Sequence, residues 1–193
     1  TLSQVQAAPT PGTLIYSGAL SYHANYDAVH YFLVEVFPLI LAQAPNTRLL
    51  VTGSTHGVAL ERLPQCPNVT FPGYLDNIWS AVAGSWVSVV PLRLGGGTRL
   101  KVLESLALGT PVVATPKGVE GLDLRADEEV LVGADPRSFA DKTLSLLNDA
   151  NLRQQLSTQG RRAVTRYDWA SIGRHFNHLL AEASARRQTP FQP

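Results

Sequence analysis

A glycine-rich segment followed by basic residues is the clearest candidate for a binding site in this chain. The segment GGGTRLK, residues 95–101, joins an apolar run typical of a strand to an apolar run with helical spacing. Glycines allow the backbone to approach a ligand closely, and the start of a helix presents unpaired amides to an anion. Arg99 and Lys101 lie in the first helical turn, where the helix dipole disfavours a cation by roughly 0.3–1 kcal/mol. Two cations in that position predict an anionic ligand, and a phosphate is the simplest one.

The same segment is also compatible with a plain structural role. A glycine-rich turn between a strand and a helix is often only a tight connection, and solvated basic side chains occur anywhere on a surface. The phosphate-binding interpretation gains support from Glu104 on the same expected helix and from a second glycine-containing loop after Val113. On a helix, however, Glu104 can equally form an ion pair with Lys101 one turn earlier.

Short apolar runs alternate with segments of helical spacing along most of the chain. Pro38 is expected to kink the first helix, and Asp76 and Asp135 are expected N-caps, the second of them followed by a proline. The expected strands are residues 13–17, 48–52, 68–71, 86–90, 111–114 and 130–132. The expected helices are residues 27–43, 76–84, 99–108, 136–148, 150–165 and 169–185.

This alternation predicts the fold class. Continuous apolar strands between helices indicate a parallel sheet covered on both faces, the doubly wound α/β class with a single Rossmann-like sheet. Ligands of such folds bind beyond the carboxyl ends of the strands. The loops at those ends are residues 18–25, 53–57, 72–75, 92–97 and 115–121. We therefore expect a ligand site where these loops converge.

Composition excludes several classes of function. The chain has 193 residues, 45% of them hydrophobic and 16% charged, as in ordinary globular proteins with a buried core. The net charge of +1 and the absence of a long basic run argue against a nucleic-acid-binding protein. The single cysteine, Cys66, excludes an internal disulfide, and the histidines do not cluster with other ligands. Neither a metal site nor a cofactor is expected.

The ends and the hydropathy of the sequence add two expectations. No apolar stretch approaches the roughly 18–20 residues that span a bilayer, and no signal peptide is visible. The chain begins at Thr1 and contains no methionine. This predicts a processed product or a piece of a longer protein.

Several motifs occur in an order and spacing that resemble one enzyme family. They are SGALSYHANYDAVHYF from Ser17, RLLVTG from Arg48, the long segment at residues 68–115, and GVEGL from Gly118. Together they resemble the C-terminal half of a family 4 (group 1) glycosyltransferase over about residues 13–180. The resemblance implies half of a GT-B enzyme, which has two Rossmann-like domains. It also implies retaining, metal-independent transfer of a hexose from a UDP- or GDP-sugar to an acceptor hydroxyl.

The resemblance implies a site for the nucleotide-sugar donor. The family signature contains two glutamates separated by seven residues, and the second, which binds the ribose hydroxyls, falls on Glu104. A carboxylate suits this role because it accepts hydrogen bonds from two neighbouring hydroxyls. The first glutamate falls on Gly96, so this chain departs from the pattern on the sugar side. The expected phosphate-binding residues are Gly18, Gly95, Gly96, Gly97, Thr98, Arg99 and Lys101.

Two further groups of residues are implied. Gly73, Tyr74 and Leu75 resemble the segment that flanks the nucleobase, although an ordinary surface turn is the alternative for Tyr74. On the sugar side the candidates are His23, Gly118 and Glu120. For these an exposed loop histidine and a structural turn remain the alternatives.

One more departure concerns charge. Many family members carry an Arg and a Lys in the loop after the first strand, where they neutralise the diphosphate. This chain has Ala19 and either Ala24 or Asn25 at those places. We expect Arg99 and Lys101 to supply part of the missing charge and to stabilise the diphosphate leaving group.

The resemblance also implies a partner domain. In GT-B enzymes the acceptor site and any catalytic acid or base lie mostly on the N-terminal domain. We expect a linker at residues 1–12, a nucleotide-sugar-binding domain at 13–165, and a C-terminal helix and tail at 166–193 that packs back toward that domain. The isolated chain should bind donor weakly and transfer nothing, because turnover requires closure of two domains. The expected location is the cytoplasm, with any peripheral membrane association made through the missing half.

Two other functions stay open at this point. A non-catalytic nucleotide-sugar or phosphate-binding module is compatible with the loss of the glutamate at Gly96. A GT-B epimerase or phosphorylase would act on related ligands without an acceptor.

Overall fold

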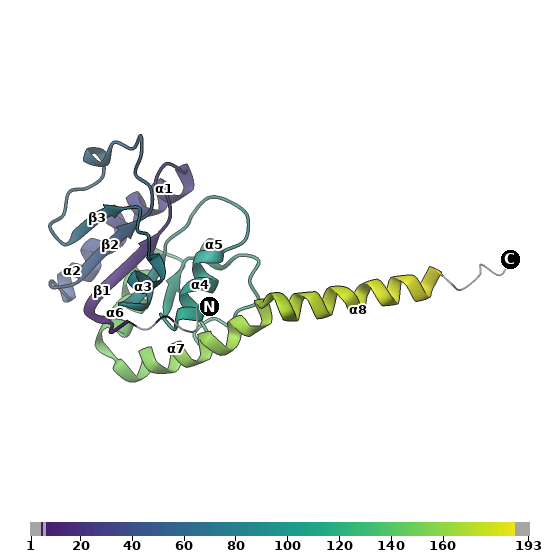
Figure 1. Cartoon of the computed structure of the whole chain (residues 1–193). Helices are drawn as coiled ribbons and strands as arrows, with labels where there is room; N and C mark the ends of the chain where they lie inside the picture. The colour runs from purple at the N-terminus through teal and green to yellow at the C-terminus, as the bar shows by residue number, and fades with distance from the viewer. Residues whose placement is uncertain (1–4, 6, 188–193) are drawn as a thin grey trace.

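The computed structural model describes residue 5 and residues 7–187, and a six-stranded parallel sheet forms its centre (Figure 1). Every strand pair is parallel and the strand order is β3-β2-β1-β4-β5-β6. The strands are β1 (Thr10–Ser17), β2 (Arg48–Thr52), β3 (Val69–Gly73), β4 (Ser85–Val90), β5 (Val112–Ala114) and β6 (Leu131–Val132). The predicted doubly wound α/β fold is confirmed.

Helices cover both faces of this sheet. The helix α2 packs against α6 on one face, and α4 packs against α3 and α7 on the other. The α-helices are α1 (His23–Tyr31), α2 (Phe37–Gln43), α3 (Ile78–Ala83), α4 (Leu100–Leu108), α5 (Pro116–Val119), α6 (Pro136–Asn148), α7 (Ala150–Val164) and α8 (Trp169–Arg187). Three shorter turns are the π-helical η2 (Phe32–Val36) and the 3-10 helices η3 (Leu60–Arg62) and η4 (Thr165–Tyr167).

The central strand β1 shows why the apolar runs are continuous. Leu14 is buried in the main core together with Phe139 of α6. The next residue, Ile15, points to the other face and is buried with Val82 of α3 and Leu108 of α4. Because side chains alternate between the faces of a strand, a sheet covered on both sides needs apolar residues at every position.

The helix expected at residues 27–43 begins earlier and is interrupted. It starts at His23, and the π-helical turn η2 separates α1 from α2 directly before Pro38. Proline has no N–H for the helical ladder, and its ring pushes away the carbonyl one turn before it. A widened π turn is one way to accommodate both effects, so the kink that Pro38 predicts lies just before the proline.

Other helices and strands begin a few residues away from their predicted starts. The expected N-cap at Asp76 is wrong, because Asn77 caps α3 and its side chain accepts a hydrogen bond from the Ser80 amide at 3.1 Å. The cap at Asp135 is confirmed, and it forms a capping box with Ser138. Strand β1 begins at Thr10, inside the expected linker, and residues 1–4 and 6 of that linker lie outside the described residues.

The helix α8 differs from the others because it projects away from the domain (Figure 1). Its main packing partner is η4, the short turn that precedes it. The tail at residues 188–193 lies outside the described part of the chain. Across the described residues, no helix combines the length and the apolar character that a membrane crossing requires.

The strand order also locates the crevice that matters most for ligand binding. Strands β1 and β4 are neighbours, but the chain leaves β1 toward α1 and α2 and leaves β4 toward α4 on the opposite face. The loops after these two strands therefore diverge at the carboxyl edge of the sheet. Such a switch point is where doubly wound folds bind their ligands.

Candidate functional site

The glycine loop after β4 lies directly against the first turn of α1. A methyl group placed on Gly95 would stand 3.2 Å from the Cβ of Ala24 and 3.5 Å from the hydroxyl of Tyr22. Gly95 also has a φ of +93°, which disfavours any side chain. The two loops at the switch point thus form one continuous surface.

The backbone amides of this loop are available to a ligand. Within the described residues, no amide from Gly95 to Arg99 donates to a protein acceptor, whereas the next amide, of Leu100, bonds to the Thr98 carbonyl at 2.9 Å. A methyl group placed on Gly96 or Gly97 would meet no atom within 4 Å. Open space and unpaired amides at the start of α4 suit an anion.

Arg99 lies behind this loop and braces it. Its side chain is only 5% exposed, and its Nη1 donates to the Gly96 carbonyl at 3.0 Å. Its Nη2 donates to the Gly95 carbonyl at 3.2 Å and to Glu120 at 3.1 Å. The buried Nε has no hydrogen-bond partner within the described residues. Arg99 thus binds the carbonyls of the loop, and the amides from Gly95 to Arg99 stay available to a ligand.

Lys101 occupies a different place from Arg99, next to Gly18 at the end of β1. Its Nζ donates to the Tyr16 hydroxyl at 2.9 Å and to Asn25 Oδ1 at 3.0 Å, and it lies 4.2 Å from the centre of the Tyr16 ring. Burial, together with the nearby charge of Arg99, lowers the pKa of Lys101 to about 7, although Glu104 acts in the opposite direction. The two cations that the sequence grouped together therefore have separate positions and separate partners.

Gly18 makes room for Lys101. A methyl group placed on Gly18 would stand 2.8 Å from the lysine Nζ and 2.9 Å from the Asn25 side chain. The neighbouring loop is equally tight, because a methyl group on Gly53 would stand 2.5 Å from the backbone of Gly18. Gly18 thus allows the side chain of Lys101 to lie close to the backbone after β1.

Glu104 lies half-buried on α4 near Lys101. Burial raises the pKa of Glu104, and the positive charge of Lys101 partly offsets this rise. Within the described residues its carboxylate forms neither a hydrogen bond nor an ion pair shorter than 4 Å, so the ion pair with Lys101 that the sequence allowed is not formed. Both carboxylate oxygens are free to accept hydrogen bonds from a ligand.

The segment expected at the nucleobase lies at the same edge of the sheet. Gly73 ends β3, and its carbonyl accepts a hydrogen bond from the Gly53 amide at 2.9 Å. Tyr74 follows with 75% of its surface exposed, and Leu75 is half-buried. The ring of Tyr74 is therefore free to pack on a planar group.

The three residues expected on the sugar side have different roles. Gly118 is buried, its amide donates to the Thr115 carbonyl at 2.9 Å, and a methyl group on it would stand 2.6 Å from the Val90 carbonyl, so packing requires this glycine. Glu120 is exposed, and hydrogen bonds from Lys117, together with Arg99, lower its pKa. His23 is exposed at the first position of α1.

Sequence reasoning missed the roles of Tyr16 and Asn25. In the sequence, Tyr16 belongs to the expected strand at residues 13–17. Asn25 stands at one of the places where many family members carry a basic residue. In the structure the Tyr16 hydroxyl donates to Asn25 Oδ1 at 2.7 Å, and Asn25 Nδ2 donates to the Ala19 carbonyl at 2.9 Å. A tyrosine near the end of a buried strand is a weak signal, since its hydroxyl needs a polar partner.

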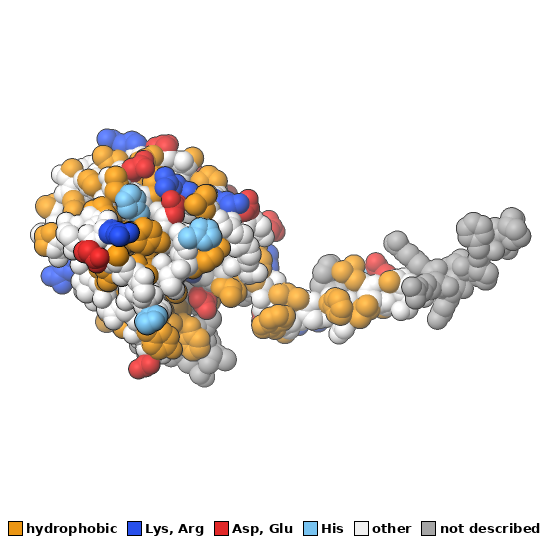
Figure 2. Space-filling model, turned by 90° about the horizontal axis from the view of Figure 1, so that it is seen from above, with side chains coloured by type: hydrophobic (Ala, Val, Ile, Leu, Met, Phe, Trp, Pro, Cys, Tyr) orange, Lys and Arg blue, Asp and Glu red, His pale blue; other side chains and the backbone are white. Residues whose placement is uncertain are grey.

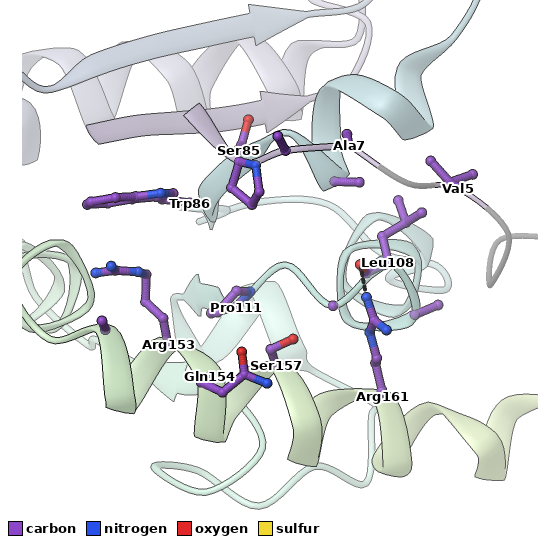
Figure 3. A pocket seen from close by; sticks show the side chains of 16 residues that line it. Val5, Ala7, Ser85, Trp86, Leu108, Pro111, Arg153, Gln154, Ser157 and Arg161 are labelled. Carbon is purple, nitrogen blue, oxygen red and sulfur yellow. Dashed lines mark hydrogen bonds between the residues drawn. The ribbon is translucent and has the colours of Figure 1, made fainter. Parts of the chain in front are cut away.

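A separate cavity of about 790 Å³ lies beside the starts of β1, β4 and β5, and Figure 3 shows the side chains that line it. There Arg153 stacks on Trp86, with its guanidinium 3.8 Å from the ring centre, and Arg161 donates to the Leu108 carbonyl at 2.8 Å. Because this cavity is at the amino ends of β1, β4 and β5, it is separate from the candidate site. The described residues contain no group of three or more metal-ligating side chains.

Comparison with known proteins places the chain in a family. A family model described as glycosyl transferases group 1 matches residues 11–149. A phosphatidyl-myo-inositol mannosyltransferase of Mycobacterium tuberculosis is 30% identical over 153 residues, 72% of this chain and 40% of that protein. A GDP-mannose-dependent monoacylated alpha-(1-6)-phosphatidylinositol monomannoside mannosyltransferase of Corynebacterium glutamicum is 27% identical over 161 residues, 77% of this chain and 42% of that protein. The chain thus spans about two fifths of the length of these relatives.

Solved structures share the fold. Anabaena Alr3699/HepE, in complex with UDP and glucose, aligns with a TM-score of 0.71 at 14% identity, over 89% of this chain and 48% of that one. The C-terminal domain of a group 1 glycosyl transferase (LpcC) from Francisella tularensis aligns with a TM-score of 0.65 at 19% identity, over 84% of this chain and 89% of that one. The chain therefore shares the fold of that C-terminal domain.

Proposed function

Because the chain belongs to the group 1 glycosyl transferases, we propose that it binds the nucleotide-sugar donor of a glycosyltransferase. The observation that carries this proposal is the arrangement at the β1/β4 switch point. Within the described residues the amides from Gly95 to Arg99 and the Glu104 carboxylate have no hydrogen-bond partner, and these groups and the Lys101 amine all belong to the loop after β4 or to the helix α4 that follows it. Amides and a cation suit the diphosphate, and a carboxylate suits the ribose hydroxyls.

The remaining parts of the donor follow from this placement. The base lies at Gly73, Tyr74 and Leu75, where the exposed Tyr74 ring can pack on its face. The sugar lies toward His23 and Glu120. A UDP- or GDP-sugar is the proposed donor, because one similar protein is named as GDP-mannose-dependent and one similar structure is a complex with UDP.

We further propose a hexosyl transfer that retains the anomeric configuration and needs no metal. Lys101 and the loop amides would stabilise the charge that develops on the diphosphate leaving group, which is the task of a metal in other transferases.

The acceptor site is proposed to lie on a second domain. The chain spans about two fifths of its relatives, and α8 carries exposed apolar residues on an arm that packs mainly on η4. We propose that α8 packs on that second domain, so that the isolated chain binds donor but transfers no sugar. A cytoplasmic location is part of the same proposal.

Calorimetric titration of the 193-residue chain with UDP, GDP and ADP tests the donor-binding role. We expect one nucleoside diphosphate to bind more tightly than the other two. We also expect the Glu104→Ala variant to lose about tenfold or more in affinity for it, since a hydrogen bond to a charged group contributes about 1.5–3 kcal/mol. The Glu128→Ala variant, which removes an exposed carboxylate outside the site, is the matched control. Absence of binding for all three nucleotides would overturn the proposal.

A further inference from the structure

Lys101 is only partly exposed, and within the described residues its amine has no carboxylate partner. Its hydrogen-bond partners in the described residues are the Tyr16 hydroxyl and Asn25 Oδ1, both uncharged. Glu104, the nearest acidic residue on the same helix, forms no ion pair with it. A buried ammonium without a counter-ion is costly, and lysine reduces this cost by giving up its proton.

Asn25 and Tyr16 hold the amine in place. Asn25 Nδ2 is anchored on the Ala19 carbonyl at 2.9 Å, and Tyr16 donates its proton to Asn25 Oδ1 at 2.7 Å. This leaves the Tyr16 oxygen and Asn25 Oδ1 as acceptors that both face Nζ of Lys101. The arrangement has room for an ammonium but supplies no negative charge to balance it.

The amine is also next to the backbone that would surround an anion. The lysine Nζ lies so close to Gly18 that a methyl group on that residue would be 2.8 Å away. Asn25 belongs to the first turn of α1, and the glycine loop rests on that turn through Gly95 and Ala24. An anion held by the loop amides would therefore provide the missing counter-charge.

We propose that the site takes up one proton at Lys101 when it binds the diphosphate of a nucleotide sugar. The inference rests on the proposed donor-binding function and describes the charge of Lys101 when the donor is bound. Lys101 would enter the bound state as an ammonium and supply part of the positive charge that is absent at Ala19 and at Ala24 or Asn25. The pH of the surroundings would then control donor affinity.

The groups that face Lys101 determine the direction of the pH effect. Burial and the charge of Arg99 lower the pKa of Lys101 to about 7, Glu104 partly offsets this, and Tyr16 is uncharged because burial raises its pKa. A bound diphosphate favours the ammonium and raises the lysine pKa again. Affinity is therefore highest below pH 7. It falls about fivefold between pH 7 and 8, as the protonated fraction drops from about one half to about one tenth.

Calorimetry with UDP-glucose and GDP-mannose measures this proton directly. The diphosphate of a nucleotide sugar is doubly esterified and does not itself titrate near neutral pH. At pH 7.5, titrations in buffers of different ionisation enthalpy should give an uptake of about three quarters of a proton per bound donor, because about one quarter of the free lysine is already protonated. Zero uptake by the wild-type chain would overturn the inference, and this measurement requires no variant.

Variants assign the proton to one residue. Lys101→Arg keeps a permanent charge, so its proton uptake should vanish and its affinity should become independent of pH between 6.5 and 8.5. Lys142→Arg, on α6 away from the site, is the matched control and should retain the full uptake. If the uptake persists in Lys101→Arg, or disappears in His23→Gln, the assignment to Lys101 is wrong.

The two proposals fail in different ways. If neither sugar nucleotide binds at any pH, the donor-binding function is wrong. If one binds without proton uptake, donor binding stands and only the protonation of Lys101 is wrong. Circular dichroism of each variant checks that the fold is retained.

Discussion

The carboxylate of Glu104 lies half-buried next to a lysine with which it forms no ion pair. A charged group in that position is poorly solvated and has both oxygens free, which is the state expected of a carboxylate that binds neutral hydroxyls. In the proposed function, Glu104 therefore binds the ribose of the donor. Binding of the ribose can be tested separately from binding of the phosphates.

We expect Glu104→Gln to weaken binding of UDP or GDP far more than it changes binding of inorganic pyrophosphate, which Glu104 affects only through the pKa of Lys101. The amide preserves size but loses one acceptor and the charge, which reduces affinity for the ribose by about tenfold or more. Competition of pyrophosphate against the preferred nucleotide, measured by calorimetry for both chains, gives the two affinities. An equal loss for pyrophosphate would place Glu104 at the phosphates instead.

At this scale the sequence allows candidate site residues to be proposed, but it does not give their geometry. The glycines, Lys101 and Glu104 are candidates because their order along the chain carries the signal. The partners of Lys101 were not found, since Tyr16 and Asn25 lie 85 and 76 residues away from it and meet it only through the packing of β1, α1 and α4. Arg99 was expected beside the phosphates, but its guanidinium instead holds carbonyls of its own loop.

At the scale of elements, Glu129 connects the loop before β6 to the short helix η4. It is buried, its side chain accepts hydrogen bonds from the Arg125 amide at 2.9 Å and from Arg166 of η4 at 2.9 Å, and Arg125 also pairs with it at 3.0 Å. Burial alone would raise the pKa of Glu129, but these hydrogen bonds outweigh it and lower the pKa. The ionised carboxylate thus stabilises the fold.

We expect Glu129→Gln to lower the free energy of unfolding by about 1–3 kcal/mol at pH 7, because hydrogen bonds to a charged group are lost. The folded pKa is depressed, so this stabilisation is fully present above the unfolded value of about 4.3 and is lost as the pH falls through the folded value. In urea denaturation, the difference in the free energy of unfolding between Glu129→Gln and wild type should be smaller at pH 3.5 than at pH 7. Glu128→Gln, next to it but exposed, should change little, and an equal effect of both variants would contradict this account.

The elements themselves were predictable where a local signal marks them. Asp135 followed by Pro136 marks the start of α6, and the apolar runs mark the buried strands. The early start of α1 was missed because Tyr22, its N-cap, forms no side-chain cap, so no local signal precedes His23. The four-residue α5 is too short to show a helical period.

At the scale of the whole molecule, the projecting helix α8 exposes a stripe of large apolar side chains. Trp169 is 84% exposed, and further apolar residues follow it at spacings of three and four, on one side of a helix. The other members of the stripe are Ile172, Phe176, Leu179 and Leu180. Figure 2 shows hydrophobic side chains along this projecting arm. An exposed stripe of this kind is typical of a helix that packs on a further surface.

The fold class was predictable because the alternation of strands and helices extends over the whole domain. The position of α8 could not be predicted in the same way. The spacing of its apolar residues indicates that one face of the helix packs on another surface, but it does not identify that surface. In the proposed function a second domain covers this face, and the chain spans about two fifths of the length of its relatives. Energetically, α8 should then contribute little to the domain described here.

We therefore expect deletion of residues 169–193 to leave the free energy of unfolding nearly unchanged, within about 1 kcal/mol, because few native contacts disappear. The same deletion should reduce binding of a hydrophobic dye and any concentration-dependent association, since the exposed stripe is removed. Urea denaturation, dye fluorescence and analytical ultracentrifugation of both chains measure these effects. Trp86→Ala in the full chain is the contrasting variant, because it removes packing between β4 and α7 and should destabilise the fold while leaving dye binding by α8 in place. A large loss of stability on deletion would mean that α8 belongs to the core of this domain and not to an interface.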